Sequence, residues 1–128
     1  MPDASQFSVD VERLEGDVAV VVLSGEIDLY TAPRFKDVVM HSIDDGVQRV
    51  VVDLTGATFI DSTALGVLVN AGKRLRLRQG VLAIACLDGS IRRILEITGL
   101  DGVFAICSSR AAALDALAPK RQARRLRP

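Results

Sequence analysis

Runs of mostly β-branched residues alternate along this chain with segments of helical spacing, and this alternation constrains the fold most. VAVVVL at 18–23, RVVVDL at 49–54 and VLAIACL at 81–87 predict buried strands. Between them, apolar residues recur three and four positions apart, as one buried face of a helix requires. Strands that alternate with helices imply right-handed crossovers and parallel pairing.

The remaining segments complete the predicted order. Residues 7–14 alternate apolar and polar side chains, which indicates an edge strand joined to 18–23 by a Gly16-Asp17 turn, and 103–107 forms a last strand. Helices are expected from a Thr31 cap to Gly46, over about 63–78, from a Ser90 cap to Gly99, and from Ser108 or Ser109 through Leu117. Residues 25–28 should leave the sheet, and 55–61 should form a loop. The prediction is an α/β fold with a mixed, mostly parallel sheet of about five strands and about four helices.

Length and charge set the domain organisation. A chain of 128 residues predicts one domain. The formal net charge is zero, but the basic residues are unevenly placed: residues 119–128 carry five and no acid, which leaves residues 1–118 at −5. We therefore expect a domain over 1–118 that does not bind nucleic acid directly, followed by a basic disordered tail over 119–128. The tail could contact the acidic face of its own domain or attach weakly to an acidic partner or to nucleic acid.

Other classes of protein are disfavoured. The longest apolar run, 18–23, is too short to span a bilayer, and the first ten residues lack the pattern of a secretory signal. A cytoplasmic protein without membrane association is expected. The chain lacks a phosphate-binding Gly-rich loop and a nucleophile elbow, so we expect no enzyme and no cofactor. Two cysteines and one histidine are too few ligands for a zinc or histidine-based metal site, so we expect no metal.

Two cysteines stand in predicted strands. Cys86 and Cys107 should be buried, inert thiols. If their strands are neighbours, the two could instead form a regulatory disulfide, so they are also a candidate redox pair.

The segment at 59–68 is the most unusual in the chain. Asp61 or Ser62 should cap a helix whose first half is apolar on nearly every side. Leu65, Leu68, Val69 and Leu75 form the expected core face, which leaves Ala64, Gly66 and Val67 on the flanks. Such a helix is either deeply buried or offers a docking face to a partner.

A hydroxyl at this helix start also suits a switch. Phosphorylation of Ser62 would add about −1.5 to −2 charges where free amide groups and the helix dipole tolerate an anion. A partner lying over the same place would be repelled.

Three segments match one family in order and spacing. They are GEIDLYTAPRF at 25–35, VVVDLTGATFIDSTALGVL at 50–68 and ILEITGLDGVFAI at 94–106. Over about residues 7–117, the chain resembles the STAS domain in its stand-alone form, the bacterial anti-sigma factor antagonist.

The resemblance implies a STAS fold and a regulatory protein that is not an enzyme. The unmodified form would bind an anti-sigma factor with serine kinase activity and so release a sigma factor. The kinase would phosphorylate the antagonist to end binding, and a phosphatase would reverse this. By carry-over, Ser62 is the phosphoacceptor, with Asp61, Thr63 and Asp28 as its neighbours. The predicted partner-binding residues are Gly25, Glu26, Leu29, Tyr30, Thr31, Ala64, Gly66, Val67 and Asn70.

The sequence differs from the common family pattern at two positions, and it is compatible with several other functions. Ala64 stands where many relatives have Gly, and Thr63 offers a second hydroxyl beside Ser62. An accessory subunit of a lipid-transport ATPase and a stressosome-type scaffold module are alternative roles for the same fold. A nucleotide-handling enzyme is disfavoured by the missing phosphate loop, and a weak homodimer is compatible with the sequence.

Overall fold

The computed structural model describes residues 6–118, so the predicted tail over 119–128 lies outside the described residues. The strands are β1 (Ser8–Leu14), β2 (Val18–Ile27), β3 (Arg49–Ile60), β4 (Val81–Ala85) and β5 (Ala105–Cys107). The helices are α1 (Ala32–Asp44), α2 (Ser62–Leu77), α3 (Gly89–Ile97), the short 3-10 helix η1 (Leu100–Gly102) and α4 (Arg110–Leu117). This order confirms the predicted α/β fold.

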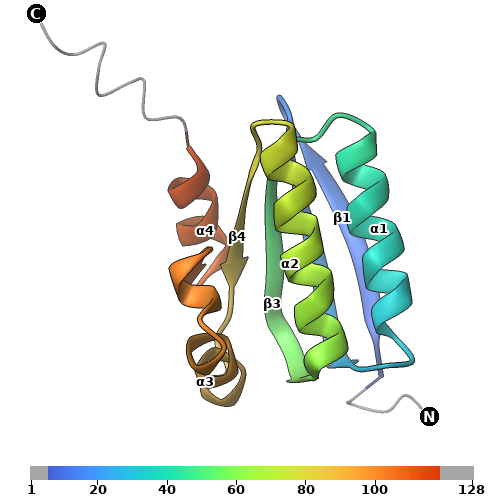
Figure 1. The fold of residues 1–128 in the computed structure, drawn as a ribbon, viewed down its shortest axis with the longest axis vertical. Helices are drawn as coiled ribbons and strands as arrows, with labels where there is room; N and C mark the ends of the chain where they lie inside the picture. Colours follow the sequence, from blue (N-terminus) through green and yellow to red (C-terminus); the bar gives the residue numbers. More distant parts are fainter. Residues whose placement is uncertain (1–5, 119–128) are drawn as a thin grey trace, which may run out of the picture.

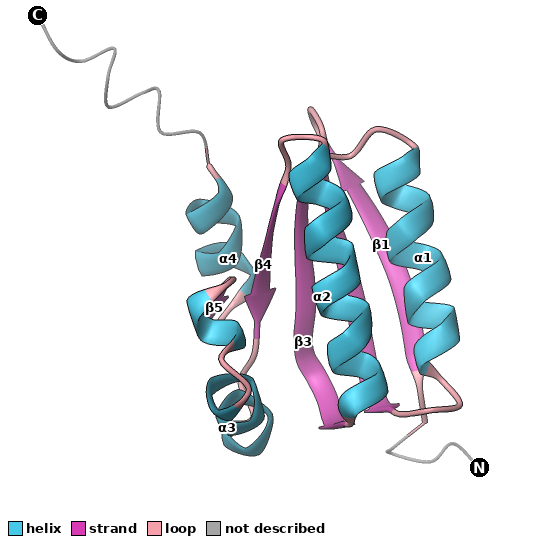
Figure 2. Ribbon diagram, in the orientation of Figure 1, coloured by secondary structure: helices cyan, strands magenta, loops and turns pink. Residues whose placement is uncertain are grey.

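The five strands form one sheet in the order β1-β2-β3-β4-β5 (Figure 2). β1 is antiparallel to β2, and every other neighbouring pair is parallel. The sheet is therefore mixed and mostly parallel, as the hairpin and the crossovers require.

The two faces of the sheet are covered unequally. Figure 1 shows α1 and α2 side by side over one face, and α4 beside β4. The larger core lies under α1 and α2 and contains residues such as Leu23, Phe35 and Leu75. A smaller cluster joins Val20 and Val51 to Leu117 of α4 on the other face. Alternate residues of each central strand thus enter opposite clusters, which explains why these strands are apolar throughout.

Several predicted boundaries were wrong. Residues 25–27 do not leave the sheet, and residues 55–60 are not a loop, because β2 and β3 run on as a pair to Ile27 and Ile60. Register shifts within this pair accommodate the polar and glycine-containing stretch that resembled a loop. β4 ends at Ala85 rather than at residue 87, and β5 begins at Ala105 rather than at residue 103.

The helix caps correct two further predictions. Asp88, not Ser90, caps α3, since its carboxylate accepts the amides of Ser90 and Ile91. Thr31 occupies the cap position of α1 without a side-chain capping bond. The prediction of Ser109 as a cap of the last helix is confirmed, because its hydroxyl accepts the amide of Ala112 at 3.1 Å.

Candidate functional site at the start of α2

The extended β2–β3 pair brings two loops together at one edge of the sheet. Ile27 and Ile60 are register partners and the last residues of their strands. The amide of Asp61 donates to the carbonyl of Ile27 at 3.3 Å, which ties the start of α2 to the end of β2. The turn before α1 therefore lies next to the first residue of α2, at the lower end of the sheet in Figure 1.

Asp61 caps α2. Its backbone is extended, and its Oδ1 accepts the amides of Thr63 at 2.9 Å and Ala64 at 3.2 Å. Ser62 follows as the first residue of the helix and is exposed. Because the carboxylate of Asp61 does the capping, the Ser62 hydroxyl is not needed for that role, and its modification would leave the cap in place.

Asp28 organises the neighbouring turn. Its Oδ1 accepts the amides of Tyr30 at 2.9 Å and Thr31 at 3.1 Å. The Thr31 hydroxyl accepts the amide of Asp28 at 2.8 Å and donates to the carbonyl of Glu26 at 2.9 Å. These bonds close a rigid turn that holds Leu29 and Tyr30 outward, with 62% and 85% of their surfaces exposed.

The bend before this turn depends on Gly25. This residue is buried and has a φ of +81°, a conformation that favours glycine. A register shift lies between Gly25 and Glu26, so the chain changes direction before the exposed Glu26.

The prediction that Ala64 and Val67 lie on the flanks of α2, outside its core face, was wrong. Ala64 and Val67 are buried to 1% and 6% exposure, so these two side chains belong to the core. Leu65, Gly66 and Val69 are half-buried, and Asn70 is exposed. The apolar first half of α2 therefore reflects burial on a wide face.

Phe59 was missing from the predicted site. It pairs with Glu26 in the register, two residues before Asp61, and 47% of its surface is exposed. No local sequence pattern marks Phe59, because its exposure between the buried Ala57 and Ile60 follows from the irregular pairing of β2 with β3. We define the switch surface as Leu29, Tyr30, Phe59 and Ser62.

The charge around the switch surface is negative. Glu26, Asp28 and Asp61 all lie within a few residues of the paired strand ends. One Oδ oxygen of Asp28 and one of Asp61 bind backbone amides. A phosphate on Ser62 would increase the negative charge of a surface that already carries carboxylates.

The two cysteines are not joined by a disulfide in this fold. Their strands are neighbours, as predicted, and the Cys86 amide donates to the Cys107 carbonyl at 2.8 Å. Their side chains nevertheless enter different clusters, Cys86 under α1 and α2 and Cys107 beside α4, so the thiols lie on opposite faces. Both are free, and burial raises the pKa of the Cys86 thiol above its ordinary value.

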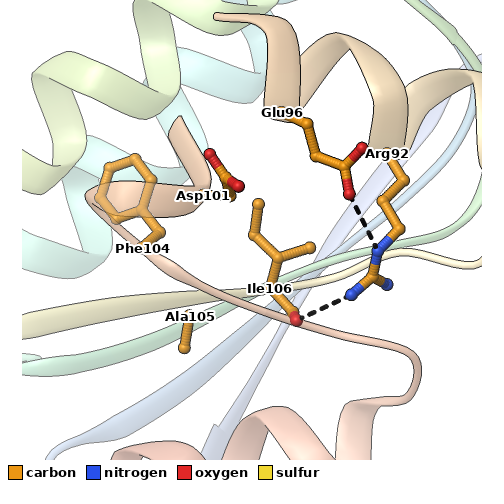
Figure 3. Close-up of a pocket in the computed structure, with 6 residues that line it drawn as sticks. All are labelled: Arg92, Glu96, Asp101, Phe104, Ala105 and Ile106. Atoms are coloured by element: carbon orange, nitrogen blue, oxygen red, sulfur yellow. Dashed lines mark hydrogen bonds and ion pairs between the residues drawn. The ribbon is translucent and has the colours of Figure 1, made fainter. Parts of the chain in front are cut away.

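A cavity of about 160 Å³ lies at the other edge of the sheet, between α3, η1 and β5 (Figure 3). Arg92 makes two polar contacts there. Its Nη2 donates to the Ile106 carbonyl at 3.3 Å, and its Nε lies 3.9 Å from Glu96 Oε2. None of the cavity's lining residues belongs to the switch surface.

Two kinds of feature are absent from residues 6–118. No group of three or more His, Cys, Asp or Glu side chains is placed to hold a metal ion in this part of the chain. Within the same range, no helix has the length and apolar character needed to cross a membrane.

Comparison with known proteins gives a consistent result. The family model of the STAS domain matches residues 8–113. An anti-sigma-B factor antagonist from Listeria monocytogenes is 37% identical over 101 residues, which cover 78% of this chain and 88% of that protein. An anti-sigma-B factor antagonist from Staphylococcus aureus is 36% identical over 80 residues, 62% of this chain and 74% of that protein. The crystal structure of an anti-sigma factor antagonist from Mycobacterium paratuberculosis superposes with a TM-score of 0.82 at 28% identity, covering 91% of this chain and 98% of that one.

Proposed function

This chain belongs to the STAS domain family, and we propose that it acts as an anti-sigma factor antagonist whose binding is switched off by phosphorylation of Ser62. The observation that carries the switch is the position of Ser62: it is the exposed first residue of α2, beside the exposed turn at Leu29 and Tyr30. The protein is thus a regulatory binding protein. The relatives' names support this role and not that of a transport subunit or a scaffold module.

The switch surface supplies the contact in this proposal. Its two aromatic residues, Tyr30 and Phe59, are large side chains of the kind enriched at the centres of protein interfaces. The turn that carries Tyr30 is held by hydrogen bonds from Asp28 and Thr31, so little conformational entropy is lost on binding.

Phosphate would change binding without unfolding the domain. Ser62 is exposed, and Asp61 keeps the cap whether or not Ser62 is modified. The start of α2 tolerates an added anion because its first amides and the helix dipole favour negative charge. The same anion opposes a partner at the switch surface, where uncompensated like charge costs several kcal/mol.

The proposed kinase, phosphatase and cellular location follow from regulation by phosphorylation of Ser62. We propose that the anti-sigma factor is also the serine kinase, that a phosphatase restores the unmodified hydroxyl, and that the exchange takes place in the cytoplasm. Thr63 is half-buried, so exposure favours Ser62 as the acceptor. Formation of a weak homodimer stays a prediction.

The test compares three variants for binding to an anti-sigma factor kinase. Ser62→Ala should bind like the wild type but take up no phosphate, and Ser62→Asp should bind about a hundredfold more weakly, equivalent to about 3 kcal/mol. Ser90→Asp is the matched control, because Ser90 is also exposed in the first turn of a helix capped by an aspartate.

Calorimetric titration with and without ATP, followed by intact-mass analysis, gives both readouts. Undiminished binding by Ser62→Asp, or phosphate uptake by Ser62→Ala, contradicts the proposed switch.

A further inference from the structure

The sheet face that carries α4 is incompletely covered. Among residues 6–118, α4 is the one helix on this face, and it packs mainly on β3, β4 and β5. The register places Asp10, Glu12 and Leu14 of β1 opposite Val22, Val20 and Val18 of β2 on the same face. Leu14 is 39% exposed and its partner Val18 is only half-buried, so the β1–β2 end of the face is open and partly apolar.

This open region is acidic. Asp10 and Glu12 lie on it, and Glu15 follows in the turn between β1 and β2, where Asp17 is already paired with Arg49. Arg110 of α4 already crosses the face to hold Glu12, with Nη1 2.9 Å from Oε1 and Nη2 3.0 Å from Oε2. The face therefore binds one arginine from the C-terminal part of the chain.

The chain leaves α4 at the end of the sheet where β1 turns into β2. Figure 1 shows α4 ending at the same end of the sheet as the turn between β1 and β2. Ala118 has an extended backbone, with φ of −61° and ψ of 141°, so the helix does not continue. The ten residues beyond it carry five basic side chains and no acid.

Residues 119–128 are long enough to extend from the end of α4 to β1. Crossing from β4, on which α4 chiefly packs, to β1 requires three strand spacings, about 15 Å. A segment of ten residues can extend about 33 Å. It also contains Leu126, an apolar residue that Leu14 and Val18 could accommodate.

We propose that residues 119–128 dock on this open face of their own domain, with their arginines against Asp10 and Glu15 and Leu126 against Leu14 and Val18. The occupant is this segment because its charge is opposite to that of the face and it begins at the edge of the face. The proposal is independent of the switch at Ser62.

The experiment uses the full chain labelled with ¹⁵N, and measures backbone order parameters of residues 119–128 at low salt. Docking predicts values above about 0.6 in the wild type, where a flexible segment gives less. In the double variant Asp10→Lys/Glu15→Lys, these values should fall to those of a flexible segment. The matched control Asp37→Lys/Asp101→Lys makes the same charge change at exposed positions away from this face and should have no effect.

A charge swap tests the pairing directly. Arg124→Glu/Arg125→Glu should free the segment without touching the folded domain, and combination with Asp10→Lys/Glu15→Lys should restore the order. Low order parameters in the wild type, or order that the charge reversals leave unchanged, would overturn the proposal. Order that appears only as protein concentration rises would mean docking between two copies, which also overturns it.

Discussion

The amide of Asp61 donates to the carbonyl of Ile27 at 3.3 Å, and this bond joins two segments that are 34 positions apart in the sequence. Ile27 precedes the turn that exposes Tyr30, and Asp61 precedes Ser62. The exposed Tyr30 and the proposed phosphoacceptor therefore lie in two segments that are joined at the paired strand ends. A change at Asp61 should affect both the stability of α2 and the position of Ser62.

Replacing the cap tests this relation. Asp61→Ala removes the acceptor for the amides of Thr63 and Ala64 and should lower the free energy of unfolding by about 1 kcal/mol. Asp61→Asn keeps an acceptor and should lose much less. Urea unfolding of both variants measures the difference, and equal stability of the two would show that the capping bonds contribute little.

The exposed aromatics should affect binding and not stability. Tyr30→Ala and Phe59→Ala should each weaken binding of the anti-sigma factor by about 2 kcal/mol, close to thirtyfold, if they act as interface anchors. Their melting temperatures should stay near that of the wild type. Leu77→Ala is the control, because Leu77 is 87% exposed at the opposite end of α2. A similar loss of affinity in all three variants would argue against the switch surface.

Two glycines of α2 should respond oppositely to alanine. A Cβ at residue 72 would lie 2.6 Å from Cε1 of Phe104, so Gly72→Ala should destabilise the fold by about 1–3 kcal/mol. No atom lies within 4 Å of a Cβ at residue 66, so Gly66→Ala should stabilise the helix by up to about 1 kcal/mol. Thermal unfolding distinguishes the two. Adding Phe104→Leu to Gly72→Ala should recover part of the loss, and no recovery would refute the clash as the cause.

The ion pair between Glu12 and Arg110 predicts a pH dependence. Its hydrogen bonds lower the pKa of the Glu12 carboxyl below the ordinary value of 4.5. Because the folded-state pKa is depressed, the carboxylate stabilises the fold above pH 4.5, and this contribution disappears as the pH falls through the folded-state pKa.

Glu12→Gln should accordingly be less stable than the wild type at pH 7, and the difference should shrink below pH 4.5. Urea unfolding at pH 7 and at pH 3.5 measures it, with Glu96→Gln as the control at a longer ion pair. A difference that stays constant with pH would be inconsistent with this origin.

The cysteines should react separately. Cys107 is the more exposed of the two, whereas Cys86 is buried with a raised pKa, so a thiol reagent should modify Cys107 first. Mild oxidation should yield no disulfide between them, because the side chains lie on opposite faces of the sheet. Mass analysis of peptides after alkylation checks both expectations, and recovery of a Cys86–Cys107 peptide would contradict the second.

The order of elements was predictable because each buried strand and each helix leaves its own periodic pattern. The runs at 18–23 and 49–54 identified the first residues and the N-terminal halves of β2 and β3 correctly. Their ends were missed, since residues 24–27 and 55–60 carry polar side chains and glycines that are typical of loops. Pairing between the two strands, which no local pattern reports, keeps these residues in the sheet.

The residue types around position 61 were also sufficient to predict where α2 begins. An aspartate followed by a serine before an apolar run predicts a capped helix, and Asp61 does cap α2. Ala64 and Val67 were placed on the flanks because spacing alone cannot tell how wide a helix face the neighbouring elements bury. In the fold that face includes both residues.

The sequence by itself determined the α/β order and a helix capped by Asp61 or Ser62, because propensity, periodicity and capping act between residues close in the chain. The tertiary structure alone decided that Phe59 faces solvent, that Cys86 and Cys107 lie on opposite faces, and that the start of α2 is hydrogen-bonded to the end of β2. These relations depend on strand register, and register is set by contacts between segments distant in the sequence.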